Sequence, residues 1–175
     1  MTEATDSFLL GDKVIIKDEP SAQSIHDKGS FGEFKDKVLE LSLAEALFLI
    51  ERGKLRVFEK TKKELTYQGF MRKAREFDNR FWVRYSIYRD IRARGYITKE
   101  ALKFGADFNV YPRGKNPDTA HSKWLLFAAS ADELFDWRRF ASMNRVAHSV
   151  KKRLLVGIVD SMSDVTYYEI SWKRP

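Results

Sequence analysis

The chain has 175 residues, 43% of them apolar, which suffices for one compact domain or two small ones and excludes a mainly disordered protein. Cysteine is absent, so disulfides, zinc ribbons and thiol nucleophiles are excluded, and no apolar run reaches the roughly 18 residues of a membrane-spanning helix. The net charge of +7 favours a polyanionic partner, because phosphate contacts release counterions, but a solvated basic surface accounts for it equally well.

The first 30 residues are polar and mostly aperiodic. They lack the basic and apolar regions of a secretion signal, so we expect a protein that stays in the cytoplasm. Lys13–Lys17 has the composition of a short strand. Pro20 and Gly29 bracket a predicted loop.

The first helix is predicted to begin at Ser42. Ser42 and Glu45 form a capping box ahead of an apolar stripe, and Gly53 is placed to end the helix. Leu55–Phe58 then reads as a strand at a sheet edge.

A second helical stretch is predicted from Thr66 to about Arg94. Asp78 and Asn79 break it, since neither residue favours a helix interior. Its second half places three aromatic side chains on one face, and Gly95 stops it: Phe81, Tyr85 and Tyr88.

The pattern changes after Gly95, where we place a domain boundary that divides the chain into residues 1–94 and 95–175. Phe108 and Val110 alternate with Asp107 and Asn109, which is typical of a half-buried strand. Turn residues occupy 112–118, and a more apolar strand follows at Trp124–Ala129.

A second capping box, Ser130 with Glu133, predicts a helix with four apolar side chains: Leu134, Phe135, Val146 and Val150. Leu154–Val159 and Val165–Ile170 are predicted strands joined by a tight polar turn. We therefore predict an α+β protein. A small N-terminal α+β domain is followed by a C-terminal α/β domain with a mixed, mainly antiparallel sheet.

The chain has three histidines, His26, His121 and His148. None pairs with another at i, i+4 beside a carboxylate, so we expect no metal site and no metal cofactor. No Gly-rich phosphate loop precedes a helix, and Gly-x-Ser-x-Gly is absent, so nucleotide hydrolysis and serine hydrolysis are not expected.

Tyr111 and His121 lie at opposite ends of one predicted hairpin loop, where the two side chains can approach each other. A histidine in a loop is nevertheless more often a surface residue than a catalyst. His148 lies inside the amphipathic helix and reads as a packed or hydrogen-bonded structural residue.

Lys151, Lys152 and Arg153 lie where that helix gives way to a strand. Cations at a helix C-terminus complement the helix dipole, so a structural role is sufficient to account for them. Composition does not select which of the three would be functional.

Six short blocks occur along the second half in this order: Gly95-Tyr96, Leu102–Tyr111, His121-Ser122, Asn144–Lys152, Val159-Asp160 and Val165–Glu169. Together they resemble the catalytic domain of archaeal tRNA-intron splicing endonucleases over residues 95–172. Leu41–Val57 is more loosely similar to the N-terminal domain of that family. Several linked blocks in the right order are more specific than any single motif.

The resemblance implies a catalytic trio of Tyr111, His121 and Lys152, with Lys151 as the alternative lysine. It implies metal-free RNA cleavage by the RNA's own 2′-hydroxyl, with no cofactor. Tyr111 would take the hydroxyl proton, His121 would protonate the leaving 5′-oxygen, and Lys152 would stabilise the phosphorane. Products would be a 2′,3′-cyclic phosphate and a 5′-hydroxyl. Whether Tyr111 ionises or only orients the hydroxyl stays open.

The resemblance also implies a precursor tRNA substrate with a bulge–helix–bulge at the exon–intron junctions. A flipped bulge base would lie between Arg145 and a second planar or cationic side chain, for which we choose Trp172. In this comparison His148 is similar to a structural helix histidine of the family.

Assembly is implied because releasing one intron takes two cuts and one chain holds one trio. We expect a homotetramer, with a heterotetramer containing a separate structural subunit as the alternative. Asp160 and Asp164 would lie on an acidic loop that enters a basic cleft of a neighbouring subunit, although the same residues also suit an ordinary solvated turn. A non-catalytic RNA-binding or structural subunit is the competing function, and an intact trio argues against it.

Overall fold

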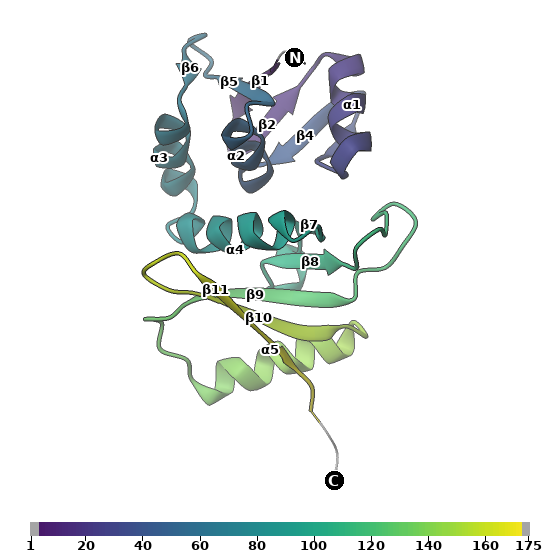
Figure 1. The fold of residues 1–175 in the computed structure, drawn as a ribbon, viewed down its shortest axis with the longest axis vertical. Coiled ribbons are helices and arrows are strands. Elements are labelled where there is room, and N and C mark those ends of the chain that lie inside the picture. The colour runs from purple at the N-terminus through teal and green to yellow at the C-terminus, as the bar shows by residue number, and fades with distance from the viewer. Residues whose placement is uncertain (1–3, 173–175) are drawn as a thin grey trace. The chain divides into compact units, whose positions relative to one another are not determined.

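A computed structural model describes residues 4–172, and the chain divides into two compact units after Trp82 (Figure 1). Each unit is built on its own β-sheet. The domain boundary near Gly95 stays a prediction. No helix in the described range is long and apolar enough to cross a bilayer.

The sheet of the first unit has the strand order β3-β4-β2-β1-β5-β6. Its strands are β1 Thr5–Leu10, β2 Lys13–Ile16, β3 Glu33–Lys35, β4 Val38–Ser42, β5 Leu55–Phe58 and β6 Glu64–Leu65. Among these described strands, only β1 and β5 pair in parallel. The predicted strands at β2 and β5 are confirmed, but β5 lies inside the sheet because β6 pairs with its outer side.

The predicted loop between Pro20 and Gly29 is wrong, because these residues form helix α1, Glu19–Gly29. The Asp18 carboxylate accepts a hydrogen bond from the Ser21 backbone N–H at 3.0 Å and caps the helix. Proline is tolerated in a first turn, where its missing N–H would have no partner inside the helix. Ser30 ends the helix at φ 51°.

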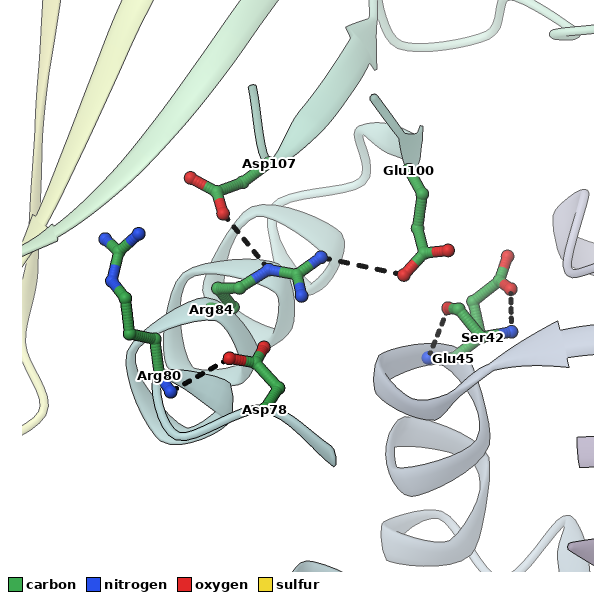
Figure 2. A network of polar contacts seen from close by, with 7 residues as sticks. All are labelled: Ser42, Glu45, Asp78, Arg80, Arg84, Glu100 and Asp107. Carbon is green, nitrogen blue, oxygen red and sulfur yellow. Dashed lines mark hydrogen bonds and ion pairs between the residues drawn. The ribbon is translucent and has the colours of Figure 1, made fainter. Parts of the chain in front are cut away.

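Helix α2, Leu43–Glu51, has the predicted capping box (Figure 2). The Ser42 hydroxyl accepts from the Glu45 N–H at 3.3 Å, and the Glu45 carboxylate accepts from the Ser42 N–H at 2.9 Å. Gly53 follows the helix at φ 63°, a conformation that favours glycine. Figure 1 shows α1 and α2 packed on the first sheet.

The predicted helix break at Asp78 is confirmed. Helix α3, Tyr67–Phe77, ends there, and helix α4, Phe81–Ala93, begins three residues later. The Asp78 carboxylate accepts from the Arg80 N–H at 2.9 Å, which turns the chain between the helices (Figure 2). The three aromatic side chains that were predicted to share one face of this helix are buried: Phe81, Tyr85 and Tyr88.

The sheet of the second unit has the order β11-β10-β9-β8-β7. Its strands are β7 Ile97–Glu100, β8 Phe108–Tyr111, β9 Trp124–Ser130, β10 Arg153–Val159 and β11 Val165–Ile170. Strands β9 and β10 are parallel and the other pairs are antiparallel, which confirms the predicted mixed sheet and α+β class.

Helices cover both faces of this sheet. Helix α5, Trp137–Ser149, packs Met143 and Ala147 against one face, next to Leu125 and Leu154. On the α4 side, Gly157 of β10 approaches Ile87 so closely that a Cβ would lie 3.1 Å from it.

The start of α5 differs from the prediction. Ser130 and Glu133 form only a turn, and the helix begins after Asp136, whose carboxylate accepts from the Arg139 N–H at 2.7 Å. Leu134 and Phe135 therefore precede the helix instead of belonging to it, and they are 95% and 39% exposed. Val146 and Val150, which follow the true N-cap by several turns, do pack on the core.

Asp107 is buried, although strand alternation predicted a solvent-facing side chain. Its carboxylate accepts from the Ala128 N–H at 2.7 Å and pairs with Arg84 Nε at 3.1 Å. Arg84 also reaches Glu100 at 3.6 Å (Figure 2). A buried carboxylate is tolerated where it is paired and hydrogen-bonded, and this one ties α4 to the sheet.

Candidate active site

Three segments of the chain end or begin at the same end of the second sheet. Tyr111 is the last residue of β8, while His121 and Lys152 come just before β9 and β10. The Lys123 N–H donates to the Val110 carbonyl at 2.9 Å, and the Arg153 N–H donates to the Lys123 carbonyl at 3.0 Å. Because β8 runs opposite to β9 and β10, its C-terminus meets the N-termini of both.

Tyr111 and His121 differ in exposure. Tyr111 is half-buried and pairs with Ile97 in the ladder to β7, while His121 is exposed. Between them, residues 112–120 form the predicted turns, in which the Asn116 side chain accepts from the Asp118 N–H at 2.9 Å. The imidazole of His121 therefore stands open to solvent beside the sheet.

Lys152 is half-buried and directly precedes β10. Its Nζ donates to the Ser122 carbonyl at 3.3 Å and also contacts the Ser122 hydroxyl. Burial lowers the pKa of this ammonium, because the charged form loses hydration. The neighbouring Lys151 is exposed and has φ 56°, and it forms part of the turn between α5 and β10.

Arg145 and Trp172 come from distant parts of the chain. Arg145 and His148 are exposed at i, i+3 on α5, so they lie on the same side of the helix. The rings of His148 and Trp172 pack with their centroids 5.0 Å apart. The structure thus brings Trp172 to the helix side that carries Arg145, and His148 packs against Trp172 at the surface.

The turn from Asp160 to Asp164 joins β10 to β11. The Asp160 carboxylate accepts from the backbone N–H groups of Met162 and Asp164, each at 2.9 Å. Asp160 therefore closes the turn, a role that the sequence prediction missed. Asp164 and Met162 are exposed.

Two further side chains at this site were not singled out from the sequence. The buried Ser122 hydroxyl donates to Asn109 Oδ1 at 3.1 Å. Asn109 precedes Tyr111 by two residues, so the period of a strand puts both on one face of β8. The two-residue spacing from Tyr111 could have identified Asn109 as a site residue. The position next to His121 could have identified Ser122.

Positive charge is frequent at this end of the sheet. Lys123 lies 4.5 Å from the Trp124 ring, and Arg113 lies 4.9 Å from the Tyr96 ring. Over residues 4–172, no group of three histidine, aspartate or glutamate side chains gathers in a way that could hold a metal ion.

Comparison with known proteins identifies a family. The family model described as tRNA intron endonuclease, catalytic C-terminal domain, matches residues 81–167, and the model for the tRNA intron endonuclease N-terminal domain matches residues 5–71. The chain therefore belongs to the tRNA intron endonuclease family, which confirms the resemblance found in the sequence.

Curated relatives match nearly the whole chain. The tRNA-splicing endonuclease of Nanoarchaeum equitans is 46% identical to it, covering 96% of this chain and 98% of that protein. The tRNA-splicing endonuclease of Thermococcus gammatolerans is 40% identical, with 95% and 97% covered, and that of Pyrococcus abyssi is 36% identical, with 98% of both chains covered.

Proposed function

We propose that this chain is an endoribonuclease that excises introns from precursor tRNA in the cytoplasm. The observation that carries the proposal is the convergence of Tyr111, His121 and Lys152 from three segments at one end of the sheet. These residues lie inside the region that matches the family's catalytic domain. Curated relatives that span the chain are named tRNA-splicing endonucleases.

Cleavage proceeds by attack of the RNA's own 2′-hydroxyl on the adjacent phosphorus. Tyr111 takes or orients the hydroxyl proton, the 2′-oxygen forms a bond to phosphorus, and the bond from phosphorus to the 5′-oxygen breaks. His121 in its protonated form donates a proton to that leaving oxygen. The products are a 2′,3′-cyclic phosphate and a 5′-hydroxyl.

Lys152 stabilises the negative charge that develops on the phosphorane. Preorganised cations act strongly at such positions because they need no rearrangement during the reaction. A tyrosine has a reference pKa near 10, so Tyr111 is a poor base unless a nearby cation favours the phenolate. In this proposal Lys152, which directly precedes β10 at the same end of the sheet, supplies that cation.

The substrate is recognised by RNA shape, as a bulge–helix–bulge at each exon–intron junction. Single-stranded bases in RNA are commonly stacked on aromatic rings or guanidinium planes. Arg145 and Trp172 offer one of each, and the packing of Trp172 on His148 supports their use as the two sides of a clamp.

The active particle is a homotetramer, because two cuts are needed for one intron and each chain contributes one trio. A heterotetramer with a structural subunit is the alternative assembly. The exposed Asp164 on a closed, hydrogen-bonded turn supports a contact with a basic cleft of another subunit. Carboxylates on such a loop pair with lysine or arginine across an interface.

The test is cleavage of a precursor tRNA, and of a small bulge–helix–bulge RNA, by the purified protein in excess EDTA. Monovalent salt is kept high enough to hold the RNA fold without magnesium. We expect two cuts, with 2′,3′-cyclic phosphate ends. Binding without cleavage would instead identify a non-catalytic RNA-binding or structural subunit, and abolition by EDTA with recovery in magnesium would overturn the metal-free mechanism.

A further inference from the structure

Ser122 lies between Lys152 and Asn109 in a chain of polar contacts. It is 6% exposed, its hydroxyl contacts Lys152 Nζ, and the same hydroxyl donates to Asn109 Oδ1 at 3.1 Å. The Ser122 carbonyl accepts from Lys152 Nζ at 3.3 Å. These three residues come from β8 and from the segments just before β9 and β10.

The donor and acceptor roles in these contacts follow from the chemistry of the three side chains. An ammonium only donates, so the Ser122 hydroxyl accepts from Lys152 and its single proton goes elsewhere. The side-chain amide oxygen of Asn109 accepts the hydrogen bond that the Ser122 hydroxyl donates. Asn109 thus orients the Ser122 hydroxyl, and Ser122 in turn directs the lysine.

The groups that hold the Lys152 ammonium, the carbonyl and the hydroxyl of Ser122, are electrically neutral. No carboxylate within residues 4–172 pairs with Lys152, and loss of hydration lowers the pKa of its ammonium. A carboxylate partner would cancel much of the positive charge, whereas a serine holds the ammonium in place and leaves the charge available to an anion.

We propose that Ser122 and Asn109 are positioning residues that hold the Lys152 ammonium in the orientation needed to meet an RNA phosphate. The inference rests on the proposed function, because that function gives Lys152 its role in cleavage. Ser122 also follows His121 directly and Asn109 shares a strand with Tyr111. The same contacts therefore tie together the backbone segments of the whole trio.

Single-turnover cleavage with protein in excess tests the kinetic consequence. In Ser122→Ala the maximal rate falls about 10- to 100-fold, the scale of loss when a catalytic group is displaced by about 1 Å. The protein concentration at half-maximal rate stays the same, because substrate contacts are intact. Ser122→Thr retains the hydroxyl and keeps most of the rate.

Ser7→Ala is the matched control, because Ser7 is also buried and donates a single hydrogen bond, to the Arg56 carbonyl at 2.8 Å in the first unit. It leaves the maximal rate of folded protein unchanged. Equal rate losses in Ser7→Ala and Ser122→Ala would show that Ser122 has only a structural role.

A double-mutant cycle separates positioning from other effects of Ser122. If Ser122 acts through Lys152, adding Ser122→Ala to Lys152→Ala causes no further loss of rate beyond about twofold, since residues acting through one another are not additive. A further loss of the full single-variant size overturns the inference. If Lys152→Ala cleaves at the wild-type rate, the proposed role of Lys152 itself has failed, which is a different outcome.

Titration of the Lys152 Cε resonance by NMR gives a readout without RNA. Removing the hydroxyl takes an acceptor from the ammonium, so the pKa of Lys152 is lower in Ser122→Ala than in the wild type. An unchanged pKa would contradict the inference. The other titratable or charged groups of these segments are present in both proteins and cancel in the comparison: Tyr111, His121, Lys123, His148, Lys151 and Arg153.

Discussion

At the scale of single residues, His121 and His148 offer a direct comparison, because both are exposed and only one belongs to the proposed trio. His121→Ala should lower the cleavage rate by about 10²–10⁴-fold with substrate binding retained, as expected for loss of a general acid. His148→Ala should leave the chemical step intact. Single-turnover rates and RNA binding of both variants measure this, and the opposite order would reverse the assignment.

Arg145 tests whether the end of α5 binds an extruded base. Arg145→Ala should weaken binding to a bulge–helix–bulge RNA by about 1–3 kcal/mol, the range of one stacking contact, and binding to a plain duplex much less. Arg138→Ala, an exposed arginine near the start of the same helix, is the control of equal charge. Equal losses on both RNAs would mean that Arg145 contacts phosphate instead.

At the scale of elements, the residue at which α5 begins depends on whether Asp136 or Ser130 caps the helix. Asp136→Ala should lower the free energy of unfolding by about 1 kcal/mol, because an N-cap side chain is lost. Ser130→Ala should cost less, since the Ser130 hydroxyl accepts only a long contact from the Asp132 N–H at 3.4 Å. Chemical denaturation of the full chain compares the two, and a larger loss in Ser130→Ala would place the functional cap at the sequence-predicted position.

Helix α1 and the start of α5 were both predicted incorrectly from local sequence, for the same reason. Both regions contain several residues that can cap a helix, and the choice among them depends on where the chain must meet its sheet. Pro20 is equally suited to a turn and to a helix's first turn, and Asp18 resolves this only once the cap hydrogen bond exists.

At the scale of the whole molecule, the turn that joins β10 to β11 tests assembly. Reversing the charge of both carboxylates would also open the turn, because Asp160 closes it. Asp164→Lys is therefore the informative change. It should shift the particle from tetramer toward dimer and lower cleavage, since a carboxylate at the proposed interface is replaced by a cation that repels the basic cleft.

Sedimentation of Asp164→Lys measures this shift. Asp12→Lys makes the same charge change at an exposed turn of the first unit and should leave the assembly unchanged. A tetramer that persists in Asp164→Lys would show that this loop is an ordinary turn.

Local signals in the sequence were enough for much of this protein. The capping box at Ser42, the break at Asp78 and the alternating or apolar runs of β8 to β11 depend on residues close in the chain, so they were predicted correctly. The linked blocks identified the family, and they proposed Tyr111, His121 and Lys152 by residue.

Contacts between distant segments were decided only by the tertiary structure. The burial of Asp107 needs Arg84 and the Ala128 N–H, which lie 23 and 21 positions away along the chain. The polar contacts that link Asn109, Ser122 and Lys152 form only because three strand ends meet. Burial of a polar group is favourable only when its partners arrive with it, and those partners are set by strand pairing, which local sequence does not encode.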